Sequence, residues 1–274
     1  MKVVVLIENS VGVLIPTSLV GEHGLSLWIK YKGHNILFDT GQTGKVVENA
    51  MRLGVDLKKT DAIVLSHGHY DHTGGLKEVL EFIKKPINIY AHKDVFSLHY
   101  AFEDHYVGIP FRKETLEGLG ANFKWIKEPL EIFPNIWVSG EVPRKTTFEK
   151  IDPRLYVKKD DQKLPDPILD DMSLFIKTDK GLVIIFGCAH SGVVNITEYA
   201  KEVTKEKRIY GIIGGTHLSS ASGDQIEETL IYLSKLNFSI LVANHCTGLK
   251  VASKLKEIFG DKFRFGTTGE IITI

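Results

Sequence analysis

The chain has 274 residues, in which 34 Lys and Arg balance 34 Asp and Glu, together with 11 His and 2 Cys. A hydrophobic content of 43% with 25% charged residues describes a globular chain with a sizeable core, which excludes a disordered or fibrous protein. A net charge of zero provides no global basic field toward nucleic acid or anionic membranes, and two cysteines exclude a cysteine-rich zinc module.

The N-terminal residues predict neither an export signal nor a membrane anchor. The apolar run 3–7 is shorter than a signal core, and acidic Glu8 follows it without a small-residue cleavage site. No stretch approaches the roughly 20 apolar residues that span a bilayer. We therefore expect a cytoplasmic protein with reduced thiols.

The first third of the chain predicts strands that alternate with helices. Short apolar or alternating runs indicate strands, and glycine-bounded amphipathic segments indicate helices. The expected strands cover residues 2–7, 25–30, 35–39, 61–66 and 87–91, and the expected helices cover residues 45–53 and 74–85. Residues 33–35 predict the tight turn of a hairpin between the second and third strands.

Residues 93–170 depart from this pattern. The segment is rich in aromatic residues and includes the turn-prone, charged run 158–167. A loop-rich excursion of this length is more often a functional element than an idle linker. We expect this insertion to serve as a substrate lid or as the contact of a homodimer.

Regular alternation returns in the last third of the chain. The expected strands cover residues 172–177, 182–186, 209–213 and 239–243, and the expected helices lie near 193–205, 224–236 and 250–258. Strand–helix alternation in both halves predicts a mixed α/β fold with two mixed sheets covered by helices. We expect a single domain over residues 1–274.

The strongest functional pattern is the segment 66–75, SHGHYDHTGG. In extended backbone, residues two apart project to the same side, so His67 and His69 can share one ion. The chain then turns toward a helix, and Asp71 with His72 can face a second, adjacent ion. This density of histidine and carboxylate is typical of a metal site rather than of chance histidines in a polar loop.

With this HxHxDH pattern the sequence resembles the metallo-β-lactamase superfamily. The segment 38–41 (FDTG) is similar to the upstream element in which an aspartate, here Asp39, supports the metal-binding loop. The segment 244–248 (NHCTG) carries His245 where the superfamily places its last metal-ligand histidine. The resemblance covers nearly the whole chain, and it implies a four-layer αββα sandwich with a dinuclear metal site at the sheet edges.

A narrower resemblance concerns one branch of this superfamily. The 7,8-dihydropterin-6-methyl-4-(β-D-ribofuranosyl)aminobenzene-5′-phosphate synthase branch is similar in segments 22–26, 66–75, 187–190, 214–218 and 244–248. These segments are specific in combination. The resemblance therefore implies that this chain has the fold of that branch. It does not imply the same substrate, because one fold can serve many substrates.

The sequence departs from the superfamily pattern at the third metal motif. Gly187-Cys188 stands where many members have a Gly-Asp whose carboxylate bridges the metals, and we interpret His190 as the remaining histidine ligand. Cys188 is either a thiolate ligand or a small buried residue, and the second interpretation is favoured because free cysteine is usually buried. Asp170 or Asp171, which precede the hairpin, could complete the site, and the missing aspartate leaves the occupancy of the second ion open.

Two further histidines are candidates for the mouth of the site. His217, in a Gly-Gly-Thr-His turn after strand 209–213, is either a ligand or a catalytic residue. Its place resembles that of a non-ligand histidine in related phosphodiesterases, so we favour acid/base catalysis or phosphate contact. His23 either lines the mouth or is a structural turn residue. Surface or packing roles are expected for His34, His92, His99 and His105.

An imidazole-dominated set with one carboxylate suits zinc, with iron or manganese as alternatives. Because the ligands come from distant loops, we expect an open catalytic site with two divalent ions, which lower the pKa of bound water to about 7. The expected metal ligands are His67, His69, Asp71, His72, His190 and His245. Asp71 and His217 are the expected catalytic residues, and His23, Asp39 and Cys188 are the additional candidates.

Three functions follow as hypotheses. The first is a hydrolase that uses metal-bound hydroxide on a small phosphorylated or otherwise anionic substrate. The second, implied by the narrower resemblance, is a transferase that condenses a dihydropterin with a ribofuranosylaminobenzene phosphate. The third is a ribonuclease-like or non-catalytic metal-binding protein. The balanced charge disfavours a nucleic-acid partner, and we expect neither nucleic acid nor membrane as a partner.

Overall fold

The first sheet combines strands of the N-terminal half with the last strand of the chain. The computed structural model describes residues 1–12, 17–160 and 162–274. The strand order is β18-β1-β2-β3-β4-β5-β8, antiparallel from β18 to β3 and parallel from β3 to β8. The strands are β1 (Lys2–Ile7), β2 (Ser26–Tyr31), β3 (His34–Phe38), β4 (Ala62–Val64), β5 (Ile87–Ala91), β8 (Ala121–Trp125) and β18 (Ile271–Thr273).

The second sheet is built mainly from the C-terminal half. Its order is β17-β16-β15-β14-β13-β10-β9, parallel from β17 to β14 and antiparallel from β14 to β9. The strands are β9 (Leu130–Phe133), β10 (Ile136–Val138), β13 (Leu174–Thr178), β14 (Gly181–Phe186), β15 (Ile209–Gly215), β16 (Ile240–Asn244) and β17 (Phe263–Phe265).

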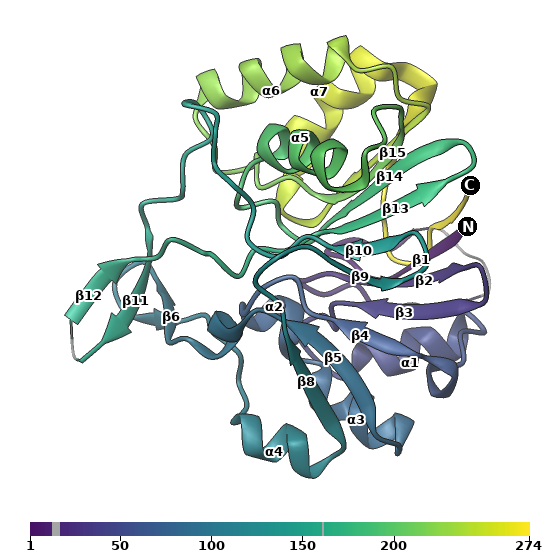
Figure 1. The fold of residues 1–274 in the computed structure, drawn as a ribbon, viewed down its shortest axis with the longest axis vertical. Coiled ribbons are helices and arrows are strands. Elements are labelled where there is room, and N and C mark those ends of the chain that lie inside the picture. Colours follow the sequence, from purple (N-terminus) through teal and green to yellow (C-terminus); the bar gives the residue numbers. More distant parts are fainter. Residues whose placement is uncertain (13–16, 161) are drawn as a thin grey trace.

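Helices cover the outer face of each sheet, so the molecule has four layers (Figure 1). The α-helices are α1 (Lys45–Arg52), α2 (Tyr70–Thr73), α3 (Leu76–Ile83), α4 (Lys113–Gly118), α5 (Val193–Thr204), α6 (Gly223–Lys235) and α7 (Leu249–Phe259). Short 3-10 helices cover Leu57–Lys59, Lys93–Phe96, His245–Thr247 and Gly260–Lys262. Helices α1, α3 and α4 lie against the first sheet, and α5, α6 and α7 lie against the second.

Three apolar layers hold the sandwich together. In β14, Val183 and Ile185 pack between the two sheets, whereas Ile184 and Phe186 pack under the helices. Successive side chains of a strand point to opposite faces, and both faces are apolar here because both are covered. The expected αββα architecture of two mixed sheets flanked by helices is confirmed.

The segment 93–170 contains more regular structure than its loop-rich sequence predicts. Strand β8 joins the first sheet, and β9 and β10 join the second. A separate sheet of order β12-β11-β6-β7 projects from the sandwich (Figure 1). We call it the inserted sheet; its strands are β6 (His99–Ala101), β7 (His105–Tyr106), β11 (Leu155–Lys159) and β12 (Gln162–Pro165). Strands of two to five residues are too short for a readable periodicity.

Outside this segment, the sequence did not predict α2, β17 or β18, and the remaining differences concern the ends of elements. The hairpin turn lies at residues 32–33 rather than 33–35, the strand expected over 61–66 is Ala62–Val64, and the helix expected over 74–85 is Leu76–Ile83. Element ends are the least readable part of a sequence pattern. Within the part of the chain that the structure describes, no helix is both long and apolar enough to cross a membrane.

Candidate metal centre

The candidate site begins where the loops after β3 and β4 meet. The Asp39 carboxylate, just after β3, accepts hydrogen bonds from the Ser66 N–H and the Ser66 hydroxyl, both at 2.7 Å. The same carboxylate lies 2.7 Å from His72 Nδ1. Because a hydrogen bond at one ring nitrogen fixes the orientation of the imidazole, Asp39 turns His72 Nε2 toward the site.

Glycines allow the metal loop to pack directly against the loop after β3. A Cβ on Gly75 would lie 2.2 Å from Thr40 O, and one on Gly74 would lie 2.1 Å from Gln42 O. No larger residue fits at such a close backbone approach. The contact brings α2, which carries Asp71, to the edge of the sheet.

The first candidate ligand group consists of three histidines from both sheets. His67 Nε2 and His69 Nδ1 lie 3.0 Å apart. His190, from the loop between β14 and α5, adds a third nitrogen, and the three ligand atoms lie within 4.8 Å of one another. Burial lowers the pKa of His69 to about 3 and the pKa of His190 well below its usual value. Both rings are therefore neutral at pH 7, as metal binding requires.

The second group surrounds the Asp71 carboxylate. Asp71 Oδ2 lies 3.2 Å from His245 Nε2, 3.2 Å from His23 Nε2 and 3.7 Å from His72 Nε2. Burial alone would raise the pKa of Asp71, but the neighbouring imidazoles hold it well below its usual value. Burial alone would lower the pKa of His72, but Asp39 and Asp71 raise it to about 9. This group therefore combines an ionised carboxylate with three imidazoles.

His245 is oriented by the loop after β1. Its backbone N–H donates to Glu8 Oε1 at 2.9 Å, and its Nδ1 lies 3.0 Å from Asn9 Oδ1. The contact at Nδ1 directs Nε2 toward Asp71, as Asp39 does for His72.

Cys188 lies between the two groups. Its side chain is buried, and Sγ is 3.1 Å from His72 Nε2. It forms close ligand groupings with His67 and His72, with His190 and His217, and with His245 and Cys246. Burial raises the pKa of the Cys188 thiol, whereas a bound cation favours the thiolate. The residue is thus both buried and close to the two groups, and the sequence interpretation treated burial and metal ligation as alternatives.

Asp170 and Asp171 bind the backbone of the ligand loops. Asp170 Oδ2 accepts the Gly68 N–H at 2.7 Å, and Asp171 Oδ2 accepts the Ser191 N–H at 2.7 Å. Gly68 lies between His67 and His69, and Ser191 follows His190. Both carboxylates therefore hold the loops that present the first group.

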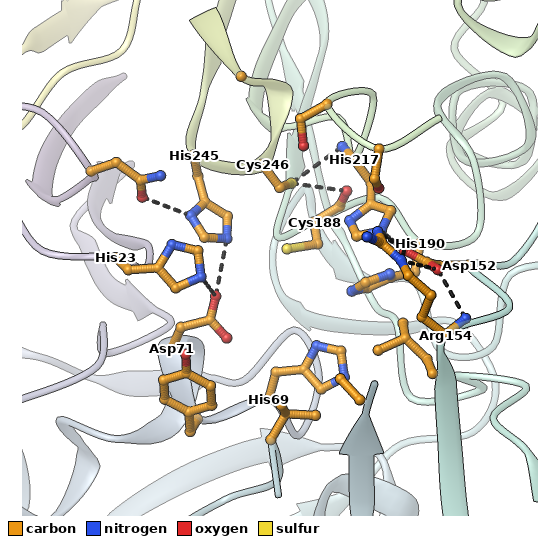
Figure 2. A pocket seen from close by; sticks show the side chains of 18 of the residues that line it. His23, His69, Asp71, Asp152, Arg154, Cys188, His190, His217, His245 and Cys246 are labelled. Carbon is orange, nitrogen blue, oxygen red and sulfur yellow. Dashed lines mark hydrogen bonds and ion pairs between the residues drawn. The ribbon is translucent and has the colours of Figure 1, made fainter. Parts of the chain in front are cut away.

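An open cavity of about 420 Å³ lies over both groups (Figure 2). Part of its wall comes from strands of the inserted sheet and from residues next to them: Ala101, Phe102, Val107, Asp152, Arg154 and Leu155. The His217 ring packs 4.1 Å from the His190 ring, with Nε2 3.9 Å from Asp152 Oδ2. Burial would lower the pKa of His217, but Asp152 and Cys246 raise it to about 9.

Sequence reasoning missed Asp152 and Arg154. Arg154 Nε donates to Asp152 Oδ1 at 2.8 Å, and its guanidinium lies over the Phe102 ring at 5.1 Å. The residues come from an irregular stretch before β11 and match no motif. Only the pairing of β11 with β6 brings them to the cavity.

The arrangement fits bound metal ions. His72 Nε2 and His245 Nε2 face each other at 3.2 Å, where at most one proton can lie between them. Within the described ranges, the buried His190 Nε2 has no hydrogen-bond partner. A cation among these atoms would satisfy the facing lone pairs, and the imidazole, carboxylate and thiolate donors suit zinc or a neighbouring transition metal.

Comparison with known proteins gives concordant results. A family model described as the metallo-beta-lactamase superfamily matches residues 19–199. A 7,8-dihydropterin-6-methyl-4-(beta-D-ribofuranosyl)-aminobenzene-5′-phosphate synthase of Methanocaldococcus jannaschii is 33% identical over 283 residues, covering 99% of this chain and 96% of that protein. An uncharacterized protein of the same organism is 36% identical over 253 residues, covering 92% of this chain and 94% of that protein. The crystal structure of Tm1679, described as a metal-dependent hydrolase of the beta-lactamase superfamily, has a TM-score of 0.86 at 28% identity, covering 100% of this chain and 99% of that one.

Proposed function

The chain belongs to the metallo-β-lactamase superfamily, and from this premise we propose that it is a hydrolase of small phosphorylated or otherwise anionic substrates. The observation that carries the proposal is the pair of ligand groups that share Cys188 beneath one open cavity. Superfamily membership itself implies a metal-dependent enzyme with divalent ions.

In this proposal His67, His69 and His190 hold one ion, and Asp71, His72 and His245 hold the other. Cys188 Sγ lies within 4.8 Å of ligand atoms of both groups and would take the place of the bridging aspartate found in many relatives. Zinc is the proposed metal, since it accepts imidazole, carboxylate and thiolate ligands alike. A bound divalent ion of this kind lowers the pKa of water and supplies hydroxide near neutral pH.

The cavity wall supplies the groups that would act on the substrate. His217, kept protonated by Asp152, stands over the first group, where it can donate a proton to a leaving oxygen or a hydrogen bond to a phosphate. Arg154 contributes a positive charge on the same wall, which favours an anionic substrate.

A second candidate is a transferase that joins a dihydropterin to a ribofuranosylaminobenzene phosphate, which attacks the dihydropterin in place of water and displaces the leaving group that the dihydropterin carries. The specific observation in its favour is the relative named as a synthase of that product, which aligns with 99% of this chain. The exposed Phe102 ring at the cavity would offer an apolar surface for an aromatic substrate.

The test is an activity panel with zinc-loaded protein. Phosphomonoesters, phosphodiesters, lactones and thioesters would be offered, each alongside a His67→Ala variant as the metal-deficient control. We expect at least one anionic ester to be hydrolysed by the wild type and not by the variant. Absence of hydrolysis, with product formed from the dihydropterin and phosphate substrates, would reject the hydrolase and support the transferase.

An Arg154→Ala variant tests the anion preference separately. We expect KM for an anionic substrate to rise about tenfold with a smaller change in kcat, because a uniform binding contact is lost. A Lys158→Ala variant, on the inserted sheet but outside the cavity lining, should leave KM unchanged. An unchanged KM in the Arg154 variant would contradict this role.

A further inference from the structure

His23 approaches the second ligand group from a loop outside the HxHxDH pattern. Its Nε2 lies 3.2 Å from Asp71 Oδ2, and its ring is 5.1 Å from the His245 ring. Figure 2 shows His23 and His245 on the same side of the Asp71 carboxylate, both directed at one oxygen. His23 therefore takes part in the geometry of the site rather than only in a turn.

The spacing of these atoms is that of a coordination sphere. The distances from Asp71 Oδ2 to the three imidazole nitrogens are 3.2, 3.2 and 3.7 Å. Ligand atoms that each lie about 2.0–2.2 Å from an ion stand about 2.8–3.6 Å apart in octahedral or tetrahedral geometry. A single hydrogen-bonded pair would place one nitrogen beside the Asp71 oxygen, whereas three imidazole nitrogens surround it here.

The loop that carries His23 is anchored on both sides. Before it, Glu22 Oε1 accepts the Thr43 N–H at 2.9 Å, and Glu22 Oε2 accepts the Thr43 hydroxyl at 2.5 Å. After it, Gly24 has φ of 140°, and a Cβ there would lie 2.3 Å from Asp71 O. These contacts tie the loop to the same backbone that presents Asp71, so the position of His23 relative to the site is fixed by the fold.

We propose that His23 is a ligand of the second metal ion, in addition to Asp71, His72 and His245. This inference rests on the proposed metal site and extends its ligand set. Together with Cys188, the second ion would have three imidazoles, a carboxylate and a thiolate. The first ion, with His67, His69 and His190, would have fewer protein ligands and therefore more room to bind a substrate.

The test compares metal binding by the wild type, His23→Ala and His23→Gln after removal of metal. Zinc and cobalt(II) are titrated against a chromophoric chelator, and bound metal is counted by elemental analysis. We expect two ions in the wild type, with one of them bound about 10–100-fold more weakly in both variants. The visible absorption of the corresponding cobalt equivalent should also change, because its coordination number falls. The exposed His105→Ala is the matched control and should bind both ions as the wild type does.

The His23 side chain is 55% exposed, so its replacement leaves the core intact, and circular dichroism would confirm folding of both variants. Unchanged affinity and unchanged cobalt absorption in His23→Ala would overturn the inference and leave His23 as an ion-pair partner of Asp71. A wild type that binds only one ion would overturn it together with the two-ion site. Failure to hydrolyse any substrate would reject the proposed hydrolase but not this metal-binding result.

Discussion

Asp39 determines which nitrogen of His72 is available to an ion. Its carboxylate accepts from Ser66 twice and lies 2.7 Å from His72 Nδ1. In Asp39→Asn, an amide N–H directed at His72 Nδ1 would move the ring proton to Nε2 and block the lone pair. In the opposite amide orientation, the amide N–H of the new side chain would face the backbone N–H of Ser66, and two donors cannot form a hydrogen bond. We expect the affinity for one ion to fall about 10–100-fold, as measured by chelator competition.

The control for this substitution is Asp61→Asn. Asp61 is exposed and accepts the Asn35 N–H at 2.8 Å, far from the ligand groups. We expect its metal affinity to match the wild type. Equal metal affinities in the wild type, Asp39→Asn and Asp61→Asn would show that Asp39 has no influence on the His72 tautomer.

Cys188 and Cys246 provide an internal comparison for the proposed thiolate ligand. Cys188 Sγ is 3.1 Å from His72 Nε2, whereas Cys246 Sγ accepts the His217 N–H at 3.2 Å. Cobalt(II) bound to a thiolate absorbs in the near ultraviolet by charge transfer from sulfur. We expect this band in the wild type and in Cys246→Ser, and its loss in Cys188→Ser. A band that persists in Cys188→Ser but disappears in Cys246→Ser would assign the ligand to the other cysteine.

At the scale of single residues, the sequence could predict side chains that fall in a contiguous motif. The pattern 66–75 indicates His67, His69, Asp71 and His72 because local backbone geometry brings them together. It could not predict Asp152 or Arg154, which reach the cavity only through pairing of β11 with β6. The position of Cys188 between the groups likewise depends on how β14 lies against the first sheet.

Strand β6 connects the inserted sheet to the metal loop through His99. His99 Nδ1 lies 2.6 Å from Asp166 Oδ2, and its ring packs 5.6 Å from the His69 ring. Burial would lower the pKa of His99, but Asp166 and Asp170 raise it to about 9. The sequence interpretation gave His99 a surface or packing role, because nothing near it in the sequence marks Asp166 as its partner.

This ion pair predicts a pH dependence of stability. A histidine whose pKa is about 9 in the folded state and about 6.5 when unfolded stabilises the fold fully below pH 6.5, and the contribution is lost as the pH rises through 9. For the metal-free protein we expect the free energy of unfolding to fall by on the order of 3 kcal/mol across this range. In denaturant titrations at a series of pH values, the free energy of unfolding of His99→Gln should change less with pH than that of the wild type. Parallel profiles for the two proteins would contradict the prediction.

At the scale of elements, hydrophobic periodicity was sufficient to predict the long helices and strands that have a turn at each end. Helices α5, α6 and α7 and the strands between them lie within a few residues of the expected ranges, because each has a clear apolar face and a turn on either side. The inserted sheet could not be predicted, since its two short hairpins, β6–β7 and β11–β12, are joined by the pairing of β11 with β6 across more than 50 residues of sequence. Pairing of that kind depends on tertiary contacts and not on local pattern.

At the scale of the whole molecule, the ligand groups join the two halves of the sandwich. His67, His69, Asp71 and His72 follow strands of the first sheet, whereas Cys188, His190 and His245 follow strands of the second. The apolar layer between the sheets brings the two sets of strand ends to one edge. A metal bound by both sets would therefore cross-link the sheets at the edge where the cavity opens.

Metal removal should consequently lower the stability of the entire fold. An ion that binds only the folded state adds about 4 kcal/mol when its free concentration is 1,000 times the dissociation constant. For a chain of this size, that corresponds to a fall of roughly 10 °C in Tm after chelation, measured by calorimetry. Zinc should restore Tm, and magnesium, which prefers oxygen ligands, should not. His67→Ala should lose part of the zinc effect, whereas the exposed His105→Ala should retain it. An identical Tm with and without zinc would contradict a cross-link between the sheets, because a metal bound there must stabilise both halves together.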